Sequence, residues 1–109
     1  DVFIDAGYVM DTHTGCAMKV AVDWFEKHKK DETNMVIVST ANPYKFPQDV
    51  LYAVTGNDVK DSFKGVKRLH AATAMAVPKC LKELKDKPAR FTKTCDGKKL
   101  FDEVLEFIK

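Results

Sequence analysis

The clearest pattern in the chain is a run of apolar positions at helical spacing between Asp11 and Lys30. Apolar residues recur every three or four positions there, so they share one face of an α-helix. These residues are Ala17, Val20, Ala21 and Trp24. Short polar side chains accept hydrogen bonds from the free N–H groups of a first turn, and Asp11, Thr12 or Thr14 can therefore act as N-cap. We predict a helix from Asp11 to about Lys30.

A different pattern follows in Met35–Val38, where four consecutive residues are apolar and three of them are β-branched. Such a run is typical of a strand that is buried on both faces, as in a parallel sheet. A second short strand is predicted over Arg90–Thr94. A strand of this kind needs neighbours for its backbone N–H and C=O groups.

Two further helices are predicted from residues that start and stop helices. The first has Pro47 in its first turn and Gly56 as its C-cap. The second runs from Asp61 to about Ala74, with Gly65 as an unfavourable residue in its first turn.

Two more helices complete the pattern toward the C-terminus. A short one begins near Pro78 and is stopped by Pro88, and Asp96 caps the last one. The apolar face of the last helix consists of Leu100, Phe101, Val104, Leu105 and Ile108.

Together these elements predict an α/β fold that is helix-rich, with four to five helices around one or two short strands. The strands are expected to belong to a larger parallel sheet, because the chain does not supply enough neighbours for them. A second copy of the chain or the rest of a longer protein would have to complete the sheet, so self-association or weak stability is expected.

Composition narrows the class of protein. The 109 residues suffice for one domain, and 45% apolar with 31% charged residues is a globular balance. The chain has eighteen basic and sixteen acidic residues, which gives a formal charge of +2. This balance of charges does not indicate a nucleic acid or an anionic membrane as partner. Three cysteines without CxxC spacing suggest reduced thiols and a cytoplasmic location. Because the chain starts at Asp1 rather than Met, we expect it to be a piece of a longer protein.

The first candidate site is the predicted strand exit Ser39–Pro43. Ligands in open α/β sheets bind beyond the carboxyl ends of the strands, and small hydroxyl and amide groups suit a polar ligand there. The alternative is an ordinary turn, since Ser, Asn and Pro favour turns.

The second candidate is Asp11–Gly15, which combines an acid, an imidazole and two hydroxyls at a helix start that favours anions. Helix capping alone is the simpler explanation. A metal site is not expected, because His13 and Cys16 share a helix face but no second pair completes four ligands. No Gly-rich phosphate loop and no catalytic triad is present in the sequence.

Two motifs, one following the other along the chain, resemble segments of the C-terminal region of the threonine synthase family. Gly7–Gly15 is similar to a family segment that ends in Asp-Pro-His-Thr-Ala, and Val38–Phe46 is similar to Ser-Thr-Ala-His-Pro-x-Lys-Phe. The similarity continues to the final helix and covers essentially residues 1–109. Thr12, Gly15 and Asn42 depart from the usual Pro, Ala and His.

The resemblance implies a reaction and a cofactor. Threonine synthases convert O-phospho-L-homoserine and water to L-threonine and phosphate, using pyridoxal 5′-phosphate (PLP). The family's Schiff-base lysine and phosphate loop lie in an N-terminal portion, so we expect no catalytic residue in this chain and no activity of the chain alone.

By the same resemblance, Thr40 is expected to bind the PLP pyridine nitrogen, and Lys45 to bind the substrate phosphate. The N-terminal portion of the enzyme is the expected partner. A dehydratase of the same fold, or an interaction domain without chemistry, remains open as an alternative.

Overall fold

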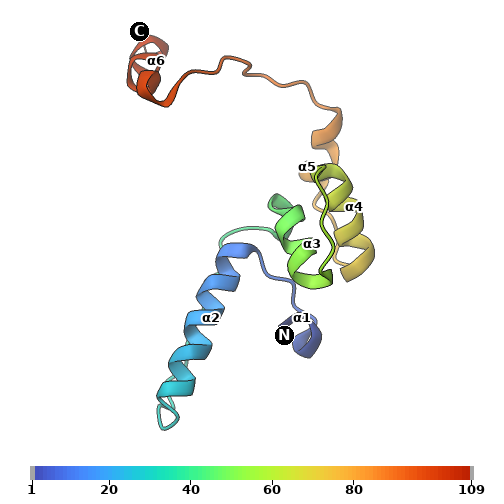
Figure 1. Cartoon of the computed structure of the whole chain (residues 1–109), viewed down its shortest axis with the longest axis vertical. Coiled ribbons are helices and arrows are strands. Elements are labelled where there is room, and N and C mark those ends of the chain that lie inside the picture. Colours follow the sequence, from blue (N-terminus) through green and yellow to red (C-terminus); the bar gives the residue numbers. More distant parts are fainter. Residues whose placement is uncertain (1, 109) are drawn as a thin grey trace.

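The computed structural model describes residues 2–108, and its regular elements are all helices (Figure 1). The α-helices are α1 (Val2–Ala6), α2 (Thr12–Lys27), α3 (Pro47–Thr55), α4 (Ser62–Thr73), α5 (Lys79–Lys82) and α6 (Leu100–Phe107). Three short 3₁₀ helices accompany them: η1 (Pro43–Lys45), η2 (Glu83–Asp86) and η3 (Gly97–Lys99).

Local capping residues set the ends of α2. The Asp11 side chain accepts hydrogen bonds from the backbone N–H groups of His13 and Thr14, which confirms it as the N-cap. The helix ends at Lys27, three residues earlier than the pattern predicts. His28 leaves the helical conformation there, and its ring stacks on Trp24 with the centroids 3.8 Å apart.

The helices α3 and α4 pack against each other and contribute half of the buried apolar cluster. Pro47 is the first residue of α3 and Gly56 ends it in the left-handed conformation, as predicted. Asp61, where the sequence predicts this helix to begin, is the N-cap of α4. A Cβ atom at Gly65 would lie 3.3 Å from Val59 Cγ1, so this glycine allows the close approach of the two helices. The buried apolar cluster consists of Val9, Tyr44, Val50, Leu51, Val59 and Leu69.

The prediction of strands is wrong for the residues that the structure describes. Met35–Val38 and Arg90–Thr94 are both irregular, and no strand occurs in residues 2–108. Val36 is 84% exposed and Val38 is 72% exposed, so the apolar run is not buried on both faces. The physical reason is that a strand needs a neighbouring strand for its hydrogen bonds, and no described segment lies in position to provide one. The run instead returns as an extended segment from the end of α2 (Figure 1).

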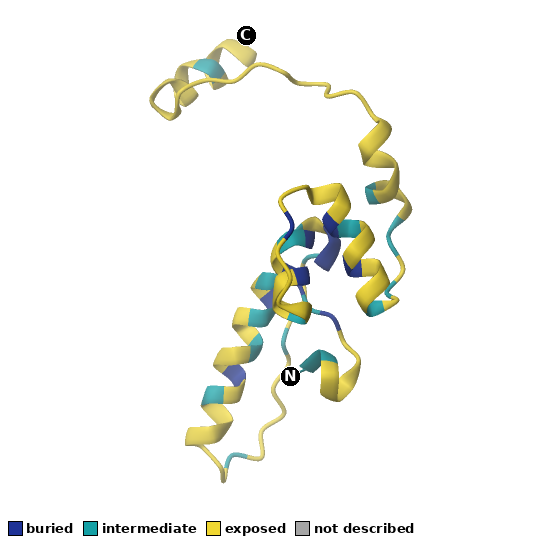
Figure 2. Cartoon of the chain, turned by 45° about the vertical axis from the view of Figure 1, so that its right-hand side comes forward, coloured by how far each residue is buried: buried dark blue, intermediate teal, exposed yellow. Residues whose placement is uncertain are grey.

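The described residues after η2, 87–108, extend away from the core. Residues after η2 are almost all exposed, and α6 lies at the end of an extended segment (Figure 2). Asp96 caps this last helical segment as predicted, through the backbone N–H of Lys98. The radius of gyration is 18.7 Å, against about 13 Å for a compact domain of this length. Much apolar surface, including that of α6, is therefore left without a partner within the described residues.

Candidate cofactor and substrate site

The site begins with the buried carboxylate of Asp11 at the start of α2. This side chain is only 1% exposed, and it accepts the backbone N–H of His13 at 3.0 Å and that of Thr14 at 3.3 Å. The Thr14 hydroxyl donates a further hydrogen bond to the same carboxylate. These bonds, the Thr14 hydroxyl first, hold the pKa of Asp11 below its usual value although burial opposes the shift. Asp11 is therefore an ionised, fully partnered group that orients the first turn of the helix.

Thr14 joins this turn to the segment that contains the second motif. Its Oγ lies 3.1 Å from the Oγ of Ser39, which is 25 residues further along the chain. The two sequence motifs are thus brought together by one hydrogen bond between side chains. Sequence reasoning treats Asp11–Gly15 and Ser39–Pro43 as two separate candidates, whereas the structure makes them parts of one site.

Further contacts fix residues 39–46 at their other end. The rings of His13 and Phe46 meet with centroids 5.0 Å apart, which ties Phe46 to the same turn of α2. Between the two anchors, Asn42 Oδ1 accepts the backbone N–H of Tyr44 at 3.0 Å and caps η1. Tyr44 itself is buried. The segment is irregular in its dihedral angles but is held at several points.

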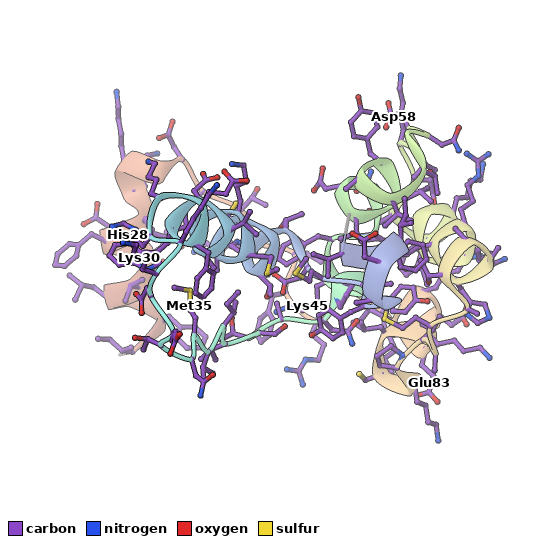
Figure 3. All side chains as sticks on the ribbon, turned by 90° about the horizontal axis from the view of Figure 1, so that it is seen from below. His28, Lys30, Met35, Lys45, Asp58 and Glu83 are labelled. Carbon is purple, nitrogen blue, oxygen red and sulfur yellow. The ribbon has the colours of Figure 1, made fainter. Side chains whose placement is uncertain are left out.

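Thr40 and Lys45, the two predicted binding residues, lie on this segment. Thr40 directly follows Ser39, and Lys45 directly precedes Phe46. Both residues are exposed. No carboxylate of residues 2–108 forms an ion pair with Lys45. Figure 3 shows Lys45 near the junction of α2 with the α3–α4 pair, far from His28 and Lys30 at the other end of α2.

The residues that depart from the family pattern have local explanations. Thr12 is the first residue of α2, a position where proline is favoured because its missing N–H group is not needed. The Asn42 side chain is occupied as the cap of η1. A Cβ atom at Gly15 would meet nothing within 4 Å, so the usual alanine would also fit. None of the three departures changes Thr40 or Lys45.

A cavity that Asp11 also lines does not include the second motif. About 520 Å³ in volume, it is lined mainly by apolar residues of α1, of the loop before α2 and of α3, including Phe3, Val9 and Val54. Thr12, Cys16 and Lys19 reach it from α2, but Thr40 and Lys45 do not line it. Sequence reasoning did not find this cavity, because it depends on how α1 packs near α3.

Within residues 2–108, the cysteines and the potential metal ligands form no further candidate site. Cys16, Cys80 and Cys95 are free and exposed. Within residues 2–108, no three His, Cys, Asp or Glu side chains gather as metal ligands. Nor does any helix in that range have the length and apolar character needed to cross a membrane.

Comparison with known proteins adds one finding. Residues 14–108 match the family model described as threonine synthase, C-terminal. No curated protein and no solved structure matches the chain. The matched range covers most of the chain and contains Ser39, Thr40 and Lys45.

Proposed function

Because the chain belongs to the threonine synthase C-terminal family, we propose that it is the C-terminal part of an enzyme that makes L-threonine and phosphate from O-phospho-L-homoserine and water. The enzyme would be a PLP-dependent lyase of amino-acid biosynthesis. The observation that supports this function is the family match of residues 14–108, and the hydrogen bond between Thr14 and Ser39 unites the two motifs beside Thr40.

The side chains of residues 39–46 fit one end of PLP. The segment contains hydroxyl, amide and ammonium groups but no carboxylate. A neutral hydroxyl suits the unprotonated pyridine nitrogen of PLP. An ammonium group suits the phosphate of the substrate. The five glycines, at positions 7, 15, 56, 65 and 97, form no loop that would cradle the phosphate of the cofactor. This chain would therefore hold only part of the cofactor, and an N-terminal portion would hold the rest.

Each of the two binding residues would have one role. When bound, PLP serves as an electron sink for the carbanion chemistry of the reaction. The Thr40 hydroxyl would bond to the pyridine nitrogen and keep it neutral, since it carries no charge that would favour a proton there. The ammonium group of Lys45 would attract the phosphate of the substrate, because no carboxylate of residues 2–108 forms an ion pair with it.

The N-terminal portion of the same enzyme is the proposed partner. Large apolar residues remain exposed along α2 and in the following segment, such as Val20 (70%), Val36 (84%) and Val38 (72%). An N-terminal portion that placed strands beside residues 35–38 would bury this surface and supply the missing hydrogen bonds. We also propose a cytoplasmic location, because free, exposed thiols persist in a reducing compartment.

The substitution Thr40→Val tests the role of Thr40 in the enzyme assembled with its N-terminal portion. Valine keeps the shape and removes the hydroxyl, so the absorbance of bound cofactor should change and kcat should fall about fivefold, the worth of one neutral hydrogen bond. Thr94→Val is the matched control, since Thr94 lies in the extended C-terminal segment. Unchanged spectrum and kinetics in Thr40→Val would remove Thr40 from the site.

The chain alone provides a second test. It should give no absorbance band of bound cofactor with PLP and release no phosphate from O-phospho-L-homoserine, because the lysine that holds the cofactor is proposed to lie elsewhere. Turnover by the 109-residue chain would contradict the proposal, as would an assembled enzyme that consumes threonine or serine and ignores the phosphorylated substrate.

A further inference from the structure

The position of Thr40 depends on the residue before it. Thr40 lies in an irregular segment without a strand ladder to fix its backbone. The preceding side chain, Ser39, makes a hydrogen bond to Thr14 across 25 residues of sequence. Any constraint that this bond places on Ser39 acts directly on the backbone of Thr40.

The protons available to the three side chains define the direction of this chain of hydrogen bonds. The Thr14 hydroxyl has one proton and donates it to the Asp11 carboxylate, which can only accept. The remaining lone pairs of Thr14 Oγ then face Ser39 Oγ at 3.1 Å, so Ser39 donates its proton to Thr14. Thr14 is 5% exposed and Asp11 1% exposed, and water therefore competes little for either group.

We infer that Thr14 is a positioning residue for Thr40, acting through Ser39, with Asp11 fixing the direction of the Thr14 hydroxyl. The link to cofactor binding rests on the proposed function, whereas the positioning itself does not. The second anchor of the segment, the ring contact between His13 and Phe46, comes from the same turn of α2. One turn of helix thus holds both ends of the segment that contains Thr40 and Lys45.

The decisive experiment measures the mobility of Thr40 by ¹⁵N relaxation in the 109-residue chain, at a concentration low enough that the chain does not self-associate. In the wild type, the order parameter of the Thr40 N–H should be near 0.85, the value of rigid backbone. Thr14→Val removes the hydroxyl but keeps the backbone bonds to Asp11 that cap the helix, and the order parameter should fall below about 0.6.

Four further variants isolate the effect of the Thr14 hydroxyl. Thr14→Ser restores it and should restore the wild-type value. Ser39→Ala should reproduce Thr14→Val, and the double variant should show no additional loss, because both changes break the same bond. Thr12→Val is the matched control, because the Thr12 hydroxyl lies 3.4 Å from His13 Nδ1 and makes no hydrogen bond to Ser39. Wild-type mobility of Thr40 in Thr14→Val would overturn the inference, as would a Thr40 that is already mobile in the wild type.

A second measurement separates this inference from the proposed function. In the assembled enzyme, Thr14→Val should change the absorbance of bound cofactor in the same direction as Thr40→Val, and Thr14→Ser should reverse the change. If Thr40 becomes mobile but neither variant alters the spectrum, the positioning role stands and the cofactor role of Thr40 fails. If Thr40→Val alters the spectrum and Thr14→Val alters neither spectrum nor mobility, the positioning role fails and the proposed function stands.

Discussion

The Tyr44 hydroxyl donates a hydrogen bond to the backbone carbonyl of Met75, 31 residues later in the chain, at 2.5 Å. This bond ties η1 to the residues that follow α4. Tyr44 is 2% exposed, and burial raises the pKa of its hydroxyl, while a hydrogen bond with the Thr73 side chain opposes the shift. The tyrosine is therefore neutral and acts as a donor at physiological pH. Because Tyr44 directly precedes Lys45, the bond also anchors the candidate site to the α3–α4 pair.

Tyr44→Phe should lower the free energy of unfolding by about 1 kcal/mol, the net worth of one hydrogen bond. The cost stays in this range because the Met75 carbonyl keeps a second contact, with His70 Nδ1 at 2.8 Å. Urea denaturation measures the change, with Tyr52→Phe as control because Tyr52 is 62% exposed. Equal stability of the two variants would show that the bond to Met75 contributes nothing.

Ala74→Gly should stabilise the chain by about 0.5–1 kcal/mol. Ala74 ends α4 with φ of 55°, a left-handed conformation that glycine adopts at lower cost than alanine. The matched control is Ala72→Gly inside the same helix, where glycine should instead destabilise by a similar amount. Thermal unfolding of both variants checks the opposite signs, and a loss of stability in Ala74→Gly would contradict the prediction.

The stabilising effect of Asp11 should depend on pH. Hydrogen bonds hold the pKa of Asp11 below its ordinary value of 3.8, so its contribution is present above that pH and is lost as the pH falls through the lower, folded-state value. Wild type should therefore exceed Asp11→Asn in melting temperature by a constant amount from pH 7 to about pH 5, and the difference should shrink at more acid pH.

Asp31 requires a control in the same experiment, because its pKa is also lowered, mainly by a hydrogen bond with Thr33. The difference between wild type and Asp31→Asn reports that group separately. A gap between wild type and Asp11→Asn that stays constant down to pH 2.5 would show that the Asp11 carboxylate is not the titrating group.

The 109-residue chain on its own should self-associate through α6. Phe101 is 72% exposed and Ile108 is 70% exposed on this helix, and exposed apolar patches of this kind favour association. Sedimentation velocity should show larger species as the concentration rises. Phe101→Ser combined with Leu105→Ser should reduce them, whereas Asp102→Ser on the acidic side should not. A wild-type chain that stays monomeric at high concentration and melts cooperatively at high temperature would contradict this prediction.

The capped starts of three helical segments and both bounds of α3 follow from the sequence alone, because they depend on neighbouring residues. Asp11, Asp61 and Asp96 act as caps through hydrogen bonds to N–H groups two or three residues away. Pro47 and Gly56 bound α3 through their own backbone preferences. Interactions over so short a range are present in the printed order of residues, and α1 is the one described α-helix that the apolar pattern did not predict.

The state of Met35–Val38 and the composition of the site depend on residues far away in the sequence. The β-branched run has the character of a buried strand, but a strand forms only beside another strand, and residues 2–108 provide none. The sequence identifies Asp11–Gly15 as a polar segment at a helix start, and Ser39–Pro43 as one at a strand exit or a turn. Only the tertiary structure shows that Thr14 meets Ser39, because a bond across 25 residues is set by where the loop after α2 returns and not by either segment.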